Sequence, residues 1–213
     1  MNKHNFIQLN TSIMSPPLVP EVKLHLAHEA VPLWQKTEDE LGEMGLPPPF
    51  WAFAWAGGQA LARFVLDNQI QVHSCRVLDL ATGSGLVGIA TGLVGADVVA
   101  VDIDAFAVLA ADMNATLNGV RLDIRCEDLL VRQPQPFEVI LVGDLFYEKY
   151  LATRVLAWLR AAQAQGSHVF IGDPGRSYLP KDQLEQLAEY NVPVTRDLED
   201  AEIKRTAVWR LRV

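Results

Sequence analysis

One segment constrains the fold of this chain more than any other. Residues 77–88 combine a short apolar strand, a turn of small residues and the start of a helix. The strand carries the acid Asp79, and the turn contains Gly83 and Gly85, which let a ligand approach the backbone closely. Such a unit is typical of the first strand, loop and helix of a parallel sheet that binds a ligand at the carboxyl ends of its strands.

The chain after this unit repeats the same alternation. Short runs rich in β-branched residues alternate with longer stretches of helical periodicity. We therefore predict an α/β fold, a doubly wound, Rossmann-like seven-stranded sheet with a C-terminal antiparallel hairpin. The expected strands are residues 76–80, 97–102, 121–125, 137–142 and 168–172, with 192–198 and 203–213 as the hairpin. The expected helices are residues 58–68, 85–93, 105–118, 148–163 and 181–190.

The length of 213 residues suits one compact domain. We expect a single domain over residues 1–213, with an N-terminal cap at 1–56 and a Rossmann-like core at 57–213. Several prolines limit regular structure in the cap. Its acidic residues are expected to form a solvated face, and a platform for a basic substrate is the alternative. These acids are Glu38, Asp39, Glu40 and Glu43.

Composition argues against several classes of protein. The chain has 18 basic and 26 acidic residues, a net charge of −8, which does not suit nucleic-acid binding. Two cysteines make neither a disulfide framework nor a four-ligand zinc site. The N-terminus has no secretory or transit pattern, and the apolar runs are well short of a membrane helix. We expect a soluble, cytoplasmic, metal-free monomer with no nucleic-acid or membrane partner.

Asp79 distinguishes between two kinds of ligand. The spacing of Gly83, Gly85 and Gly88 also fits the fingerprint of a dinucleotide site. In such a site the loop meets a pyrophosphate, for which a carboxylate at the strand end is a poor neighbour. The same carboxylate would stabilise a cationic ligand with an amino-acid end. S-adenosylmethionine has that character, and we expect it as the cofactor.

Acids also follow the next two expected strands. Asp102 ends the second strand and is expected to accept hydrogen bonds from the two ribose hydroxyls of the cofactor. Asp104 precedes a helix, and we expect it to cap that helix. Asp128, after the third strand, is placed to meet the adenine amino group, and a simply solvated acid is the alternative.

The fourth strand ends in an acid and an aromatic residue. Asp144 and Tyr147 follow this strand, at the edge of the sheet where ligands of doubly wound proteins bind. We expect both to point at the reacting centre. The alternative is that Asp144 caps the helix that begins near Glu148 and that Tyr147 packs under this helix.

Aromatic residues cluster before the first core helix. Phe53 is expected to be a core residue. Trp55, followed by Gly57, is expected to form a wall over a sulfonium or an adenine, helped by cation–π attraction. His25 and His28 have no nearby partners that would make a metal site, and a solvated face is expected for them.

The motifs together resemble those of the seven-β-strand, class I S-adenosylmethionine-dependent methyltransferases. Within that class the chain is similar to the family that methylates lysines of the electron-transfer flavoprotein β-subunit. The Trp-x-Gly-Gly-Gln-Ala-Leu and Gly-Asp-Pro-Gly-Arg segments are the specific ones. The resemblance rests on residues 18–26, 51–61, 79–85, 102–104, 143–147 and 172–176.

The resemblance implies protein-lysine methylation and roles for individual residues. Asp144 would orient the lysine nitrogen and Tyr147 would line the lysine channel. Asp173 and Arg176 would lie at the rim and contact the protein substrate, and a turn fixed by proline and glycine is the alternative. Ala81 stands where the family's loop usually opens with Gly, at the amino-acid end of the cofactor.

Two further interpretations stay open on the sequence. The chain could be a methyltransferase with a similar core that acts on a ribosomal protein or a small amine. It could also be a nicotinamide-dependent oxidoreductase or a cofactor-binding module without catalysis.

Overall fold

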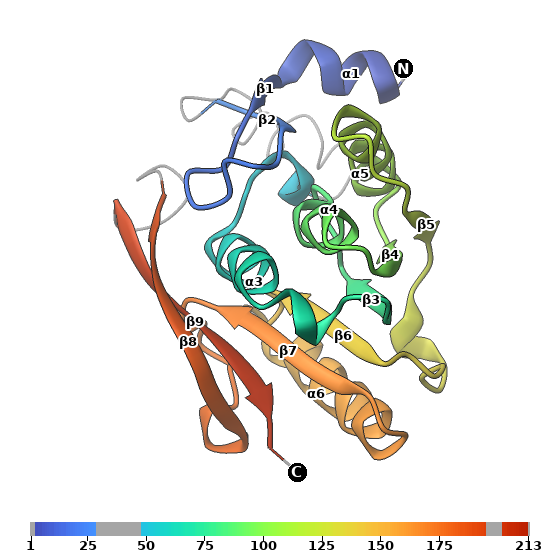
Figure 1. Ribbon diagram of the computed structural model, residues 1–213, viewed down its shortest axis with the longest axis vertical. Helices are drawn as coiled ribbons and strands as arrows, with labels where there is room; N and C mark the ends of the chain where they lie inside the picture. Colours follow the sequence, from blue (N-terminus) through green and yellow to red (C-terminus); the bar gives the residue numbers. More distant parts are fainter. Residues whose placement is uncertain (1–2, 29–47, 195–201, 213) are drawn as a thin grey trace.

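The computed structural model describes residues 3–28, 48–194 and 202–212, in which a seven-stranded sheet is the main feature (Figure 1). Its strands are β3 (Arg76–Leu80), β4 (Asp97–Asp102), β5 (Asp123–Cys126), β6 (Val139–Gly143), β7 (His168–Asp173), β8 (Leu184–Pro193) and β9 (Ile203–Leu211). A separate two-stranded sheet pairs β1 (Ser12–Met14) with β2 (Leu24–Leu26). The helices are α1 (Lys3–Asn10), α3 (Ala56–Asp67), α4 (Leu86–Leu93), α5 (Ala105–Leu117) and α6 (Lys149–Ala164). Short 3-10 helices are η2 (Phe50–Ala52), η3 (Gln69–Gln71), η4 (Leu129–Val131) and η5 (Lys181–Gln183).

The strand order confirms the predicted fold class. The order is β5-β4-β3-β6-β7-β9-β8. The first five strands in this order run parallel, and β9 is antiparallel to both β7 and β8. The chain moves outward from β3 to β5 and then returns to the other side of β3 with β6. Ligands of such sheets bind beside this reversal, beyond the carboxyl ends of the strands.

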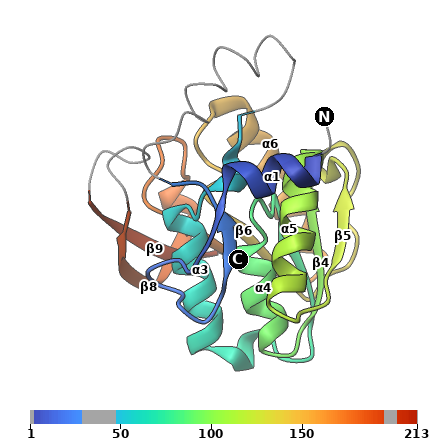
Figure 2. The ribbon, with the colours of Figure 1, turned by 90° about the horizontal axis from the view of Figure 1, so that it is seen from above.

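Both faces of the sheet are covered by helices (Figures 1 and 2). Val77 and Leu141 pack with α3 and α4 on one face. Leu78 and Ile140, a register pair of β3 and β6, pack with α6 on the other face. Strands buried on both sides need continuous apolar runs, which is how the central strands of this chain are composed.

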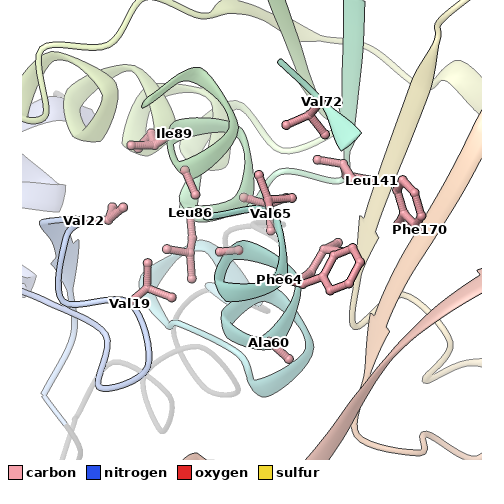
Figure 3. Packing of buried hydrophobic residues seen from close by; sticks show 14 of the residues in the cluster. Val19, Val22, Ala60, Phe64, Val65, Val72, Leu86, Ile89, Leu141 and Phe170 are labelled. Carbon is pink, nitrogen blue, oxygen red and sulfur yellow. The ribbon is translucent and has the colours of Figure 1, made fainter. Parts of the chain in front are cut away.

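Residues 3–28 pack on the outer side of the helices. Val19 and Val22 belong to the cluster that includes α3 and α4 (Figure 3). In the same cluster Phe64 of α3 contacts Phe170 of β7, with ring centroids 5.8 Å apart. Ile7 of α1 packs near Phe106 of α5 in a third cluster. The four acids expected to form a solvated face lie outside the described residues.

The prediction of a helix at residues 181–190 is wrong, because most of this segment belongs to strand β8. The segment is rich in Leu, Glu, Gln and Ala, which favour a helix locally. As a strand it pairs with β9 along its length and buries Leu184 and Val192. Tertiary packing overrides local propensity here. Residues 195–198, expected as part of the hairpin, lie outside the described residues.

None of the helices within the described ranges is long and apolar enough to cross a membrane.

Two glycines bring α3 directly against the end of β7. A Cβ atom on Gly57 would overlap the carbonyl oxygen of Gly172, and a Cβ on Gly172 would overlap the carbonyl oxygen of Gly57. Only glycine permits this approach at either position. A Cβ on the neighbouring Gly58 would meet no atom within 4 Å. The first turn of α3 therefore lies beside the carboxyl ends of β6 and β7.

We predict opposite effects of two adjacent Gly→Ala substitutions on stability. Gly57→Ala should lower the free energy of unfolding by about 2–3 kcal/mol, because the added methyl group has no room. Gly58→Ala should raise it by about 0.5–1 kcal/mol, because alanine is the better helix residue and the space is open. Urea unfolding of the two variants measures both. Equal stabilities would contradict the close approach of α3 to β7.

Candidate active site

The predicted site residues gather in two groups at the carboxyl edge of the sheet. The first group follows β3 and β4 and contains Asp79, the glycine loop and Asp102. The second group follows β6 and β7 and contains Asp144 and Arg176. Tyr147 follows β6 and lies beside Phe50; burial raises the pKa of its hydroxyl, and the charges of Glu148 and Asp102 raise it further.

Asp79 holds the glycine loop together from inside. Its Oδ2 accepts a hydrogen bond from the Thr82 hydroxyl at 2.5 Å and from the Gly88 amide at 2.8 Å. The side chain is 2% exposed. The Gly88 amide belongs to the first turn of α4, where a dinucleotide site would present free amides to a phosphate. Here the Gly88 amide already donates its hydrogen bond to the Asp79 carboxylate. This arrangement argues against a pyrophosphate site.

The electrostatics of this group favour a cation. Burial raises the pKa of Asp79 from 3.8 to about 6, with a further contribution from the charge of Asp102. Burial also raises the pKa of Asp102. Among the described residues, no Lys or Arg forms an ion pair with either acid. A positively charged ligand would therefore stabilise both carboxylates, whereas a phosphate would be repelled.

The loop between β3 and α4 turns through left-handed backbone conformations. Ala81, Gly83 and Gly85 have φ angles of 58°, 55° and 83°. Glycine adopts such angles without strain, whereas the methyl group of Ala81 makes its conformation unfavourable by about 1 kcal/mol. The Ala81 position is thus one where the family's glycine would relieve strain.

The end of β4 carries an acid and an exposed apolar residue. Asp102 accepts hydrogen bonds from the Gly83 amide at 2.9 Å and from the Asp104 amide at 3.0 Å. Asp104 accepts a hydrogen bond from the Phe106 amide, which confirms the predicted helix cap. Ile103, between them, is 75% exposed.

Asp128 has two partners within the chain. It caps η4 through the Leu130 amide at 2.9 Å and lies 3.3 Å from the guanidinium of Arg154. The carboxylate is part of the surface beside the end of β5. Contact with an adenine amino group stays a prediction for this residue.

Asp144 lies at the centre of the second group. Its backbone is left-handed, with φ at 54°, and its Oδ2 accepts a hydrogen bond from the Gly58 amide of α3 at 2.8 Å. Its Oδ1 lies 2.8 Å from the guanidinium of Arg176. The alternative that Asp144 caps α6 is wrong, because Glu148 caps that helix through the amides of its first turn. Gly57 also touches this group, because a Cβ on it would reach the Asp144 carboxylate.

Aromatic side chains line the second group. The Arg176 guanidinium lies over the Trp55 ring, 5.6 Å from its centroid. Phe50 lies 6.0 Å from Trp55 and 5.7 Å from Tyr147 between ring centroids. Tyr147 is 47% exposed and does not lie under α6 as the alternative required. Phe53 is buried, as expected for a core residue. The side chains form an aromatic wall, defined here as Phe50, Trp55 and Tyr147.

Asp173 was expected at an exposed rim, and this placement is wrong. The side chain is 1% exposed and its Oδ1 accepts hydrogen bonds from the amides of Gly175 and Arg176, both at 2.7 Å. It therefore fixes the turn that presents Arg176, which was the alternative interpretation. Its Oδ2 accepts no hydrogen bond from the described residues, and burial raises its pKa to about 6. Arg176 itself is 21% exposed.

Three residues of the site were missed from the sequence. Phe50 belongs to an aromatic stretch, but nothing in that stretch distinguishes it from a core residue. Ile103 could have been found, since an apolar residue between two acids at a strand end has no core to join. The Gly58 amide could not, because its bond to Asp144 spans residues far apart in the sequence. Among the described residues, no three His, Cys, Asp or Glu side chains gather as a metal site.

Comparison with known proteins assigns the family. The chain is 38% identical to the electron transfer flavoprotein beta subunit lysine methyltransferase of Xenopus laevis, over 96% of this chain and 85% of the relative. It is 35% identical to the protein of the same name from Rattus norvegicus, over 96% and 82%. The chain belongs to this lysine methyltransferase family. Residues 59–145 of the methyltransferase also match the family model of ribosomal protein L11 methyltransferase (PrmA).

Solved structures support the fold of the methyltransferase. Magnesium protoporphyrin IX methyltransferase from Synechocystis PCC 6803 superposes with a TM-score of 0.54 at 13% identity, covering 73% of this chain and 78% of that one. At this identity the likeness concerns the fold alone. The sheet of the methyltransferase thus follows an architecture used for methyl transfer to a different acceptor.

We predict that Asp79→Asn changes how stability depends on pH. In wild type, the carboxyl has a pKa of 3.8 when unfolded and about 6 when folded, so the unfolded chain loses its proton first as the pH rises. The wild type should therefore lose up to about 3 kcal/mol of unfolding free energy relative to Asp79→Asn between pH 4 and pH 7. Denaturant unfolding of both proteins across this range measures the difference. Parallel pH profiles would contradict the raised pKa of Asp79.

Proposed function

We propose that the methyltransferase transfers a methyl group from S-adenosylmethionine to a lysine side chain of a protein, the electron transfer flavoprotein β-subunit. The relatives that match almost the whole chain are named for that substrate. The observation that carries the cofactor assignment is the Asp79 carboxylate on the first turn of α4. It accepts a hydrogen bond from an amide that a phosphate site would leave free, and it adds negative charge near Asp102.

The first group of the site fits this methyl donor. S-adenosylmethionine supplies a methyl group on a positively charged sulfonium. Asp79 and Asp102 favour a cation, and the left-handed loop lets the backbone at Gly83 and Gly85 approach a ligand. Asp102 would accept hydrogen bonds from the ribose hydroxyls, and Ile103 would provide an apolar surface for the adenine. Asp128 would meet the adenine amino group beyond it.

The second group fits a lysine side chain. A lysine amine has a reference pKa of ~10.4, so it arrives charged and must lose one proton before its lone pair can attack. The aromatic wall would attract the ammonium group as it enters. The exclusion of water around the bound amine would then favour proton loss, because desolvation disfavours the charged form. Asp144 would orient the nitrogen through its remaining protons, and the released proton would pass to water. The nitrogen would then gain one bond to the methyl carbon while the carbon–sulfur bond breaks.

The position of Arg176 gives it a defined part in this arrangement. Its guanidinium bridges Asp144 and the Trp55 ring, so a positive charge already lies where the substrate ammonium would bind. Binding of the lysine would displace this side chain outward, whereas Asp173 would hold the turn that carries it. Arg176 would then contact the protein substrate from the rim.

A second substrate class has one specific observation in its favour. The ribosomal protein L11 methyltransferase model matches residues 59–145, which include Asp79, Asp102 and Asp144. The match includes Asp144 of the second group but leaves out Tyr147, Arg176 and also Trp55, which was expected as a wall over the cofactor and lies in the second group instead. It therefore supports a shared cofactor half and says little about the acceptor. The net charge of −8 favours a basic protein surface over nucleic acid as partner.

Ligand-induced stabilisation tests the cofactor. S-adenosylhomocysteine or S-adenosylmethionine at ~100 times its Kd should raise the unfolding free energy by about 2.7 kcal/mol. Thermal unfolding with each of these two ligands measures this, and NAD at the same concentration is the control. Stabilisation by NAD alone would overturn the methyltransferase assignment.

We predict that Asp144→Asn lowers kcat/KM for methylation of the flavoprotein β-subunit by about 10²-fold, because the lysine nitrogen loses its orientation. Transfer of labelled methyl groups and intact-mass analysis measure the effect. The Kd for S-adenosylhomocysteine should stay within about twofold of wild type, since Asp144 belongs to the other group of the site. Asp128→Asn, on the same edge of the sheet, is the matched control and should retain acceptor turnover at saturating cofactor. Full activity of Asp144→Asn would remove the role of this residue.

A further inference from the structure

A buried asparagine on α5 contacts the glycine loop from behind. Asn114 is fully buried, and its Nδ2 donates a hydrogen bond to the carbonyl oxygen of Ser84 at 2.8 Å. Ser84 lies between Gly83 and Gly85 in the loop. The Oδ1 of Asn114 accepts a hydrogen bond from the His25 amide at 2.7 Å. The side chain of Asn114 thus joins the loop at Ser84 to His25, which lies 59 residues earlier in the chain.

The bond to Ser84 completes the fixation of the loop. The peptide group that joins Ser84 to Gly85 bonds to Asn114 through its oxygen and to the Thr82 carbonyl through its N–H, the latter at 2.9 Å. The preceding Gly83 amide bonds to Asp102. Without Asn114, the Ser84 oxygen would lose its partner and this peptide group could rotate. The backbone that faces the cofactor would then be less well ordered.

The loop lies so close to α5 that the two must move together. A Cβ on Gly85 would lie 3.1 Å from both Cα and Cβ of Ala111, one turn before Asn114 on the helix. The space between the loop and α5 is therefore filled without a side chain on Gly85. A shift of α5 would displace the loop directly.

The N-terminal segment that contains His25 donates hydrogen bonds to the rest of the protein from every second backbone amide. We call residues 23–27 the N-terminal strap. The amide of Lys23 bonds to Asn118 Oδ1 at 2.9 Å, that of His25 to Asn114, and that of Ala27 to the Ala52 carbonyl at 2.8 Å. Ala52 lies in η2, which begins with Phe50 of the aromatic wall. The strap therefore connects the cofactor loop with the wall on the acceptor side.

We propose that Asn114 is a positioning residue for the cofactor loop and that it makes the affinity for S-adenosylmethionine depend on its hydrogen bond with the His25 amide of the N-terminal strap. The inference rests on the proposed cofactor. Asn114 does not touch the cofactor itself. It acts through the Ser84 carbonyl, and the strap holds its side chain in the orientation that this bond requires.

Asn118 offers a matched control for the test. It lies one turn after Asn114 and bonds to both the amide and the carbonyl of Lys23, but it has no bond to the loop. Asn114→Ala and Asn118→Ala should both lower stability. Only Asn114→Ala should weaken S-adenosylhomocysteine binding, by about tenfold, the effect expected when one buried hydrogen bond is lost. Calorimetric titration of the two folded variants with S-adenosylhomocysteine measures the Kd of each.

Steady-state kinetics separate positioning from a general loss of fold. In Asn114→Ala the KM for S-adenosylmethionine should rise about tenfold while kcat at saturating cofactor stays within about twofold of wild type. Equal affinities of Asn114→Ala and Asn118→Ala would overturn the inference. A wild type that binds neither S-adenosylmethionine nor its demethylated product would instead overturn the proposed function.

A measurement on the wild-type protein covers the case that Asn114→Ala does not fold. Coupling between two sites is reciprocal, so cofactor binding must stabilise the strap if the strap stabilises the loop. Saturating S-adenosylhomocysteine should slow hydrogen exchange of the His25 amide at least fivefold more than that of the Lys23 amide. Equal slowing of the two amides would contradict the path through Asn114.

Discussion

A single buried carboxylate oxygen organises the first group of the site. The Oδ2 atom of Asp79 accepts hydrogen bonds from the Thr82 hydroxyl and the Gly88 amide. These bonds hold the end of β3, the loop and the first turn of α4 together. The oxygen also adds negative charge beside the first turn of α4, where the free amides of a dinucleotide site bind a phosphate. The geometry of the loop and its preference for a cation therefore have the same origin.

The second group of the site depends on a different constraint, the absence of side chains at Gly57 and Gly172. Their close approach brings the first turn of α3 within hydrogen-bond distance of Asp144. The backbone of Asp144 is left-handed. Its carboxylate bonds to α3 through Oδ2 and forms an ion pair with Arg176 through Oδ1. The two constraints together shape the two groups at the carboxyl edge of the sheet, the glycine loop after β3 and the surroundings of Asp144 after β6.

The sequence was sufficient for features that depend on local order. Asp79, Asp102 and Asp144 were predicted at the site because acids at the ends of parallel strands share one edge of the sheet. The helix expected at 181–190 failed because its local propensity yields to pairing with β9. The partners of Asp144 and the buried position of Asp173 were beyond reach, because they arise from contacts between segments distant in the sequence.

The long outer strand β8 has a consequence for the behaviour of the protein in concentrated solution. An unpaired strand edge can recruit another chain and start aggregation. In β8 the register shifts between Gln186 and Ala188, and the strand ends in Pro193, which offers no N–H. Glu185 and Glu189 along it are engaged by arginines of β9. The edge strand of the sheet is thus irregular and charged, and these features disfavour the pairing of β8 with a strand of another chain.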